Sequence, residues 1–200
     1  MSKLRARKIK LLLFDVDGVL TDGKIWIFPS PAAQPSVLER SATGDEADRE
    51  VRGSGLIEAK GFNAHDGAGV SLARLGGLKT GLITKRISET VALRARDLKM
   101  DHVYQGIHNK AVVFKKILEK DRITADEVAF VGDDVIDLPV LRKCGLAIAV
   151  KNARPEVKAE AHWITPHAGG DGAARDAIEY ILKAQGKWKK AVEDYISERS

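Results

Sequence analysis

The amino-acid sequence predicts an α/β protein whose Rossmann-like core is a three-layer, doubly wound parallel sheet. Two observations favour this fold class. Short apolar runs alternate with amphipathic segments of helical period along most of the chain, which is typical of a parallel sheet covered by helices on both faces. The length of 200 residues, with 44% apolar and 30% charged residues, suits one domain with a single buried core.

The predicted strands are short apolar runs that end in polar or glycine-containing turns, and each is followed by a helical pattern. In chain order, we expect strands at residues 8–14, 79–83, 102–104, 127–131 and 146–150. Helices are expected at residues 67–75, 88–98, 109–120, 134–144 and 172–185. Ser88 fits an N-cap, and Gly145 fits a helix stop directly after Cys144. The pattern therefore predicts about five βα units.

Residues 29–55 interrupt this alternation. They are rich in Pro, Ser, Ala, Gly and acidic residues and show no sustained apolar period. The flanking segments 24–28 and 56–62 carry β-type residues and could pair as an extended β-hairpin flap with a mobile insert at its tip. Because no segment has a second core of its own, we expect a single domain over residues 1–200, with no large cap domain and with a C-terminal tail at 186–200.

The charge and cysteine content exclude several classes of protein. The formal net charge of +5 comes from the first ten residues, which carry five basic residues and no acid. This distribution, with only 6% aromatic residues, argues against a nucleic-acid-binding face. The single cysteine, Cys144, excludes an intrachain disulfide and fits the reducing cytoplasm. Asp15 and Asp17 cut the apolar run after the basic start, and no segment has the apolar length of a membrane span, so we expect a soluble cytoplasmic protein.

Two acidic turns carry the strongest functional signal. Asp15 and Asp17 follow the first predicted strand at alternate positions, and Asp133 and Asp134 follow the strand at 127–131. Taken alone, the Asp-x-Asp string is equally consistent with a functional site and with a turn whose two carboxylates are solvated. In open parallel sheets, however, ligands bind beyond the carboxyl ends of the strands, where both pairs fall. Carboxylates that converge there repel one another unless a cation lies between them, and hard oxygen ligands favour Mg²⁺.

A magnesium site at this edge implies an anionic substrate, and two residues could hold it. Thr84 follows the strand at 79–83 with a hydroxyl, and Lys110 opens a helix after the strand at 102–104. At that position the lysine charge and the helix N-terminus both favour a phosphate. Each residue also has an ordinary alternative, because Thr84 could be a helix cap and Lys110 a surface charge.

The same residues match a known family. Taken in order, Asp15-x-Asp17, Thr84, Lys110 and Gly132-Asp133-Asp134 match the four motifs of the haloacid dehalogenase superfamily, which this sequence resembles. A closer resemblance, to the cap-less 3-deoxy-D-manno-octulosonate 8-phosphate phosphatase family, covers residues 9–190 with the insert excepted. It rests on the strings Asp15-Val-Asp-Gly-Val-Leu-Thr-Asp-Gly23, Phe62-Asn-Ala-His-Asp-Gly-Ala-Gly69, Tyr104-Gln-Gly-Ile-His-Asn-Lys110, Val131-Gly-Asp-Asp-Val-Ile-Asp-Leu-Pro-Val140, Gly169-Gly-Asp-Gly-Ala-Ala-Arg175 and Gln185-Gly-Lys-Trp188.

The resemblance implies a Mg²⁺-dependent phosphomonoesterase. Asp15 would be the nucleophile that forms an aspartyl-phosphate, and Asp17 would protonate the leaving group and then deprotonate water. The carboxylates of Asp15 and Asp133 and the backbone carbonyl of Asp17 would hold Mg²⁺. Asp134 would face the outer waters of the metal or Lys110.

Further residues would bind the substrate. By the same resemblance, Thr84 and Lys110 would bind the transferring phosphoryl oxygens. The implied substrate contacts are Asn63, His65, Asp66, Gly67, Ser71, Arg86, Arg94 and Lys110. Arg86 and Arg94 suit the carboxylate of a sugar acid, although either could be a solvated surface charge. The chain departs from the family at Lys85, where a glycine is usual, and at His65, where an arginine is common.

The resemblance also implies an assembly and a substrate. A homotetramer would cover each site with hairpins and C-terminal tails from neighbouring subunits, and the insert could alter access or be a decoration without a role. The substrate would be 3-deoxy-D-manno-octulosonate 8-phosphate, in lipopolysaccharide biosynthesis. One alternative is a phosphatase for a nine-carbon ulosonate 9-phosphate of the KDN or sialic type. Another is a catalytically silent oligomerising module, which the four intact motifs disfavour.

Overall fold

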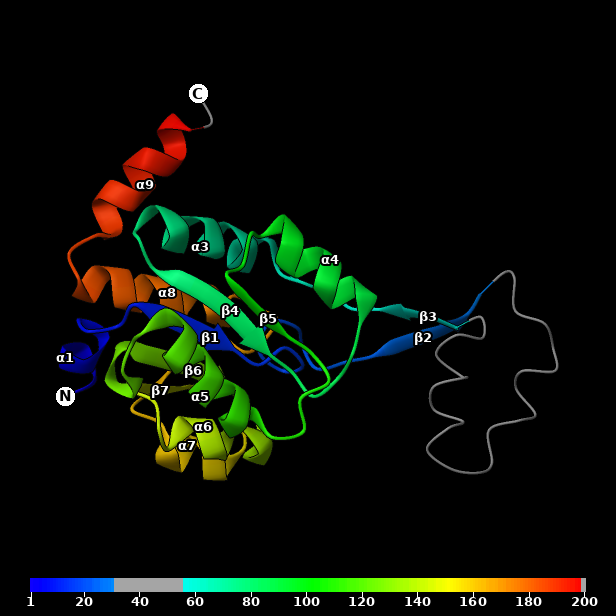
Figure 1. Ribbon diagram of the computed structural model, residues 1–200. Helices are drawn as coiled ribbons and strands as arrows, with labels where there is room; N and C mark the ends of the chain where they lie inside the picture. The colour runs from blue at the N-terminus through cyan, green and yellow to red at the C-terminus, as the bar shows by residue number, and fades with distance from the viewer. Residues whose placement is uncertain (31–55, 199–200) are drawn as a thin grey trace. The chain divides into compact units, whose positions relative to one another are not determined.

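The computed structural model describes residues 1–30 and 56–198 (Figure 1). Contacts divide the chain into two compact units, one formed by Met1–Gly23 with Gly61–Ser200 and the other by Lys24–Lys60. The larger unit contains a six-stranded parallel sheet in the order β5-β4-β1-β6-β7-β8. Its strands are β1 (Leu11–Phe14), β4 (Lys79–Ile83), β5 (His102–Tyr104), β6 (Val128–Gly132), β7 (Leu146–Ala149) and β8 (Trp163–Ile164).

Helices cover both faces of this sheet, as the sequence predicts. The α-helices of the larger unit are α1 (Ser2–Ala6), α3 (Ala64–Leu75), α4 (Glu89–Asp97), α5 (Lys110–Asp121), α6 (Leu138–Leu141), α7 (Pro155–Glu160), α8 (Ala173–Ala184) and α9 (Trp188–Ser197). Helices α3, α4 and α8 lie on one face, and α5, α6 and α7 lie on the other (Figure 1). Two 3-10 turns, Ala125–Glu127 and Val135–Asp137, flank β6. The three-layer, doubly wound α/β fold is therefore confirmed.

Strand β1 lies at the centre of the sheet because its sequence is apolar throughout. All four residues of Leu11–Phe14 are completely buried, as expected for a parallel strand covered on both faces. Phe14 is aligned with Leu82 of β4 and with Val131 of β6. The three strands therefore end together, and the residues that follow them meet at one edge of the sheet.

Most predicted elements are present with small shifts at their ends. The strands at 79–83 and 102–104 are confirmed at both ends. The strand expected at 8–14 begins only at Leu11, and β8, α1 and α7 were not predicted. Ser88 is confirmed as the N-cap of α4, where its hydroxyl accepts from the backbone N–H of Val91.

The helix expected at 134–144 is wrong in its extent. The segment forms a 3-10 turn at Val135–Asp137 and then the single helical turn α6. The physical reason is that the Asp137 side chain turns back and accepts from the backbone N–H groups of Asp133 and Asp134, which closes a tight turn. Gly145 is not a helix stop, because α6 ends at Leu141, and the Gly145 N–H donates to the carbonyls of Ala125 and Val128.

The smaller unit contains the predicted hairpin. Strands β2 (Trp26–Pro29) and β3 (Leu56–Ala59) pair antiparallel, with Trp26 opposite Ala59. Its large exposed apolar side chains are Trp26, Ile27, Phe28 and Ile57. Residues 31–55, the part of the insert expected to be mobile, lie outside the described residues, so that expectation stays a prediction.

Two further features bear on chemistry and location. Cys144 is buried, and burial raises the pKa of its thiol to about 12, so the thiol stays protonated at neutral pH. Within residues 1–30 and 56–198, no helix has the length and apolar character needed to cross a membrane.

Candidate active site

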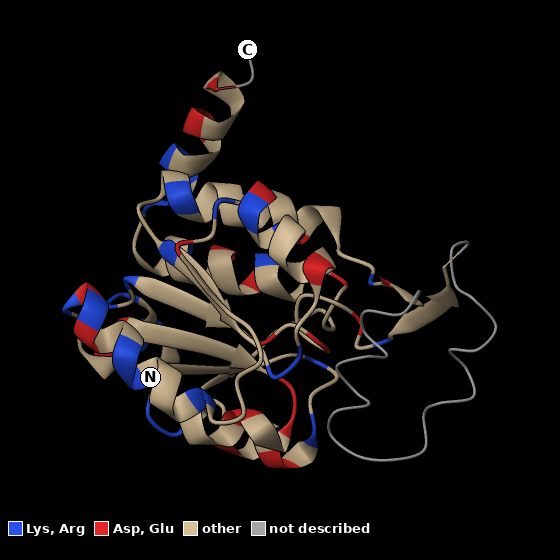
Figure 2. Ribbon diagram, turned by 45° about the vertical axis from the view of Figure 1, so that its right-hand side comes forward, with Lys and Arg blue, Asp and Glu red and all other residues tan. Residues whose placement is uncertain are grey.

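The predicted functional residues meet beyond the carboxyl ends of the strands. Asp15 directly follows β1, Thr84 follows β4, and Asp133 follows β6, while Lys110 begins α5 after β5. Acidic and basic segments of the chain come together in the loops beyond the arrowheads of the sheet (Figure 2). The parallel register of the strands thus brings together residues that are far apart in sequence.

A buried cluster of one ammonium and several carboxylates forms the centre of the site. Lys110 Nζ lies 2.8 Å from Asp15 Oδ1 and 2.7 Å from Asp137 Oδ1. All three side chains are almost completely inaccessible to solvent, so the alternative of Lys110 as a surface charge is wrong. Oxygens of Asp15, Asp133 and Asp137 lie within 4.8 Å of one another.

Asp137 belongs to this cluster, although the sequence reasoning, which includes it in a motif, gave it no role in the site. Besides Lys110, its Oδ2 accepts from the backbone N–H of Asp133 at 3.0 Å and of Asp134 at 3.4 Å. The sequence does contain a signal for Asp137, because it is the third acidic residue after β6, in the same short turn as Asp133 and Asp134. Asp134 itself is exposed and accepts from Val135 N–H at 2.7 Å, so the structure pairs Lys110 with Asp137 rather than with Asp134.

The carboxylates outnumber the cation, and the titration of the site reflects this surplus. Burial, then the charge of Asp137, raises the pKa of Asp15 to about 6. Burial, then the charges of Asp137 and Asp15, raises the pKa of Asp133 to about 7. Burial alone would lower the pKa of Lys110, but Asp137 and Asp15 outweigh it and raise that pKa. The site therefore favours an additional positive charge.

One atom of the site matches a metal ligand in particular. Asp133 Oδ1 is buried and has no hydrogen-bond partner within the described part of the protein. A buried, unpartnered carboxylate oxygen is costly unless a cation or water satisfies it. Together with the adjacent oxygen of Asp15, it offers the hard oxygen donors that Mg²⁺ prefers. The residues present therefore fit a divalent cation at this point.

The loop after β1, residues 15–23, is called the catalytic loop below. Its shape depends on the carbonyl of Val16, which accepts from the N–H groups of Val19, Leu20 and Thr21 at 3.2, 2.9 and 3.1 Å. Gly18 has a φ of +88°, and a Cβ at this position would overlap the carboxylate of Asp133. Only glycine allows the loop to turn this closely past the carboxylate.

Asp17 and Arg86 lie near each other in the structure. Asp17 is half-buried in the catalytic loop, and its Oδ2 lies 3.9 Å from Arg86 Nε. Lys85 is exposed, and the described non-glycine residues with positive φ are Lys99 and Arg122. The lysine that replaces the usual glycine at 85 therefore adopts an ordinary backbone conformation.

Thr84 is buried and belongs to the turn that joins β4 to α4. Its Oγ1 accepts from the N–H of Arg86 at 3.3 Å, and its own N–H donates to the Tyr104 carbonyl at 2.9 Å. Because Ser88 is the residue that caps α4, the alternative of Thr84 as a helix cap is wrong. The hydroxyl stands instead at the end of β4, beside the strand that carries Asp15.

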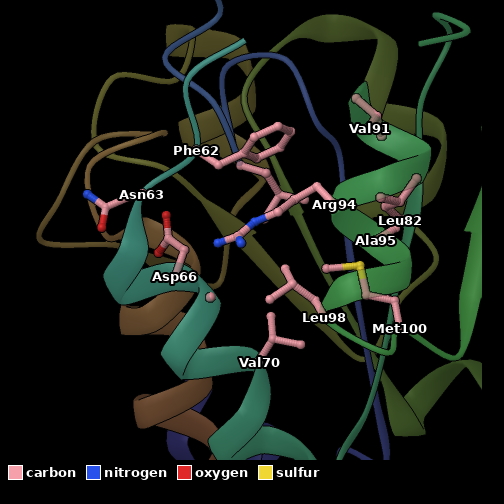
Figure 3. A pocket seen from close by; sticks show the side chains of 12 residues that line it. Phe62, Asn63, Asp66, Val70, Leu82, Val91, Arg94, Ala95, Leu98 and Met100 are labelled. Carbon is pink, nitrogen blue, oxygen red and sulfur yellow. The ribbon is translucent and has the colours of Figure 1, made fainter. Parts of the chain in front are cut away.

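A mostly apolar pocket between α3 and α4 contains several of the predicted substrate contacts (Figure 3). Asn63, Asp66, Gly67 and Arg94 all line it. The Arg94 side chain extends from α4 toward the N-terminal end of α3 (Figure 3). Its guanidinium lies 5.8 Å from the centre of the Phe62 ring, and its Nε is buried without a hydrogen-bond partner in the described chain.

The other predicted substrate contacts have roles within the fold. Asn63 caps α3 by accepting from the N–H of His65, which is exposed. Asp66 is buried, and its Oδ1 accepts from the N–H of Arg175 at 2.8 Å, at the start of α8. The Ser71 hydroxyl donates to a carbonyl of its own helix, α3. These contacts give Asn63, Asp66 and Ser71 structural roles in and around α3.

Comparisons with known proteins agree with this geometry. A family model described as haloacid dehalogenase-like hydrolase matches residues 83–176. The curated 3-deoxy-D-manno-octulosonate 8-phosphate phosphatase of Escherichia coli strain K12 is 37% identical over 187 residues, which cover 94% of this chain and 86% of that relative.

Solved structures of similar proteins contain metal ions. A 3-deoxy-D-manno-octulosonate 8-phosphate phosphatase from Moraxella catarrhalis, determined in complex with magnesium, phosphate and KDO, is similar with a TM-score of 0.80 and 30% identity, over 96% of this chain and 97% of that chain. The cobalt-bound phosphatase from Haemophilus influenzae has a TM-score of 0.75 and 26% identity, over 94% of this chain and 99% of that one.

Proposed function

Since the chain belongs to the 3-deoxy-D-manno-octulosonate 8-phosphate phosphatases of the haloacid dehalogenase type, we propose that it hydrolyses 3-deoxy-D-manno-octulosonate 8-phosphate to the free sugar acid and phosphate. The observation that carries the proposal is the Lys110 ammonium buried between Asp15 and Asp137. This arrangement places a carboxylate nucleophile next to a fixed positive charge, which phosphoryl transfer requires.

Asp15 is the nucleophile in this proposal. Its Oδ1 is held by the N–H of Val16 at 2.7 Å and by Lys110, which leaves Oδ2 to attack phosphorus. A bond forms between Oδ2 and phosphorus while the ester bond breaks, and Asp17 gives a proton to the leaving alkoxide. Asp17 then takes a proton from the water that attacks the aspartyl-phosphate, so phosphate leaves and both residues return to their starting states.

The remaining residues of the edge bind and orient the phosphoryl group. Thr84 and Lys110 hold its oxygens, and Asp134, at the turn after β6, orients water. The carboxylates of Asp15 and Asp133 and the backbone carbonyl of Asp17 would hold Mg²⁺, which when bound supplies positive charge to the transferring oxygens. The unpartnered Asp133 Oδ1 supports this assignment.

The residues at the start of α3, with the facing Arg94 of α4, are the proposed binding site for the sugar acid. The site lies outside the enclosed pocket between these helices, because that pocket has a volume of only about 10 Å³ and holds no more than a water molecule. Arg94 and Arg86 supply positive charge for its carboxylate, and Asn63 and His65 supply polar groups at the start of α3. Gly67 leaves space for Arg94, because a Cβ at that position would lie 2.5 Å from Arg94 Nη2. Asp66 and Ser71 support the same helix.

Assembly and location are part of the proposal. We infer a homotetramer that shares its sites between subunits, supported by the exposed apolar side chains of the hairpin. A cytoplasmic location is supported by the single, unreactive Cys144. Light scattering on the purified protein tests the assembly, and the same measurement after deletion of residues 31–53 tests whether the insert takes part in it.

One assay tests the catalytic proposal. Phosphate release is measured with Mg²⁺ present and after chelation, on the eight-carbon ulosonate 8-phosphate, a nine-carbon ulosonate 9-phosphate and glucose 6-phosphate. We expect release that requires Mg²⁺ and is fastest on the eight-carbon compound. Equal, slow rates on all three compounds would refute the substrate while leaving a general phosphatase, and faster release from the nine-carbon compound would identify it as the substrate.

A further inference from the structure

The loop between β8 and α8, residues 165–172, lies directly against the catalytic loop. It contains Gly169 and Gly170, which belong to one of the strings that carry the family resemblance and which the proposed mechanism does not use. Gly170 N–H donates to the carbonyl of Val19 at 2.9 Å. A Cβ at Gly169 would overlap the carbonyl oxygen of Gly18, so the two backbones touch at this point. The contact lies at the residue that follows Asp17.

The 165–172 loop is itself held in place on its other side. Asn152, in the turn after β7, accepts from the buried Gly169 N–H with its Oδ1 at 2.9 Å. The buried Thr165 hydroxyl donates to the carbonyl of His167 at 2.6 Å. Asp176 accepts from the backbone N–H of His167 at 2.9 Å. The loop therefore has fixed contacts in the turn after β7 and in α8.

The turn that carries Asn152 also reaches the second acidic turn of the site. Arg154 N–H donates to the backbone carbonyl of Asp133 at 2.8 Å. One short turn is thus bonded both to the loop that packs on Gly18 and to the residue that offers the unpartnered carboxylate oxygen. These bonds connect the two acidic turns, which come from strands far apart in sequence, through a third segment.

We propose that Asn152, through Gly169, is a positioning residue that fixes the catalytic loop so that the Asp17 carboxyl points at the leaving-group oxygen. The contact is made by backbone atoms adjacent to Asp17, where a small displacement redirects its side chain. Misplacement of a reacting group by about 1 Å costs about 100-fold in rate. The role of Asp17 as the acid rests on the proposed function, whereas the mechanical part of the proposal rests on the contacts alone.

Two substrates with different leaving groups distinguish a misplaced Asp17 from a general loss of active-site structure. Hydrolysis of an alkyl phosphate releases an alkoxide, which must be protonated as it leaves. The rate of that hydrolysis therefore depends on where the Asp17 carboxyl group points. A p-nitrophenolate leaves without a proton. The ratio kcat/KM covers the steps up to release of the leaving group, and so it isolates the step in which Asp17 acts as the acid.

The test compares Asn152→Ala, Asn152→Asp and the wild-type protein on the sugar-acid phosphate and on p-nitrophenyl phosphate. Asp17→Asn serves as the reference for loss of the acid. Thr124→Ala is the matched control, because it removes a side-chain hydrogen bond, from Thr124 to Glu127, at the opposite end of the strands. Hydrogen exchange of the peptide 16–23 is measured on the same proteins and needs no activity.

We expect Asn152→Ala to lower kcat/KM about tenfold on the alkyl ester and less than about twofold on the aryl ester, with faster exchange in residues 16–23. Asn152→Asp keeps an acceptor for Gly169 N–H and should restore both readouts. Thr124→Ala should change neither.

Equal losses on both esters, or unchanged exchange in the catalytic loop, would overturn the proposal. If the wild-type protein hydrolyses neither ester, the proposed function fails, and the exchange measurement still decides whether Asn152 holds the loop. Gly169→Ala provides a stronger perturbation of the same contact, and normal exchange in a folded Gly169→Ala protein would also count against it.

Discussion

The two ends of the central sheet carry ionisable clusters of opposite character. At the carboxyl ends, three carboxylates gather around the single ammonium group of Lys110. At the amino ends, the carboxylate has basic partners. Asp121 Oδ2 lies 3.0 Å from Lys79 Nζ, at the start of β4, and 3.0 Å from His102 Nε2, at the start of β5. A second pair, Lys10 with Glu127, precedes β1 and β6 at a distance of 2.5 Å.

The pKa values of the acidic residues also differ between the two ends of the sheet. Burial and neighbouring carboxylates raise the pKa of Asp15 and Asp133. At the other end, burial would raise the pKa of Asp121, but hydrogen bonds from His102 and Lys79 outweigh it and lower that pKa. The hydrogen bond from Lys10 lowers the pKa of Glu127 to about 2. The amino ends are therefore arranged for stability, and the carboxyl ends for a cation and an anionic ligand.

The strongest test of the contrast removes the nucleophile. Asp15→Asn should reduce phosphate release by at least about 10³-fold, because no other described carboxylate stands beside Lys110 with an oxygen free to attack. The fold should persist, since the substitution removes one of several mutually repelling charges. Phosphate release and circular dichroism check the two statements, and a folded variant that still turns over with Mg²⁺ would contradict the assignment.

Metal and pH should act together on stability. The pKa values of Asp15 and Asp133 in the folded protein, about 6 and about 7, lie above the ordinary value of 3.8. The folded metal-free state thus binds more protons than the unfolded state between about pH 4 and pH 7, and its stability falls as pH rises through that window. Added Mg²⁺ opposes this loss, so its benefit should be larger at pH 8 than at pH 5.

Thermal unfolding with and without Mg²⁺ measures this effect. At saturating metal and pH 8, we expect a rise in Tm of roughly 5–10 °C, and Asp133→Asn should remove most of it. An increase of the same size at both pH values would show that the metal acts elsewhere than at these carboxylates.

A substitution at the amino ends of the strands should lower the stability of the protein without changing its catalysis. Asp121→Ala leaves the buried Nε2 of His102 without its acceptor, which should cost about 1–3 kcal/mol in the free energy of unfolding. Urea unfolding measures the loss. The kcat of the variant should stay within about twofold of the wild-type value, and a large fall in kcat would mean that the two ends are coupled.

The smallest effect is expected at the more exposed pair. Glu127→Gln removes the charge that faces Lys10 but keeps an oxygen that can accept from Thr124. Exposed ion pairs contribute little to stability and are screened by salt. Urea unfolding at low and high salt should give a difference from wild type that shrinks as salt rises, and a constant difference would point to packing instead.

The sequence predicts the strands and the acidic turns well because both are local. Apolar runs such as 79–83 are bounded by polar or glycine-containing turns, and Asp15 and Asp133 directly follow strands. The sequence shows Asp137 as a third acid after β6, but its contact with Lys110 could not be predicted, because that contact joins segments that only the fold brings together. Strand β8 was missed because it has only two residues. A terminal helix was one of two interpretations of the tail, which contains α9, and the sequence gave no definite range for it.

The alignment of β1 with β4 also has a consequence for chain entropy. The segment that joins these neighbouring strands contains the whole hairpin and residues 31–55. The entropic cost of closing a loop grows only with the logarithm of its length, about 0.6 kcal/mol for each doubling. We therefore expect a change in the number of residues between β2 and β3 to alter the folding equilibrium less than the same change in the short connections around β6.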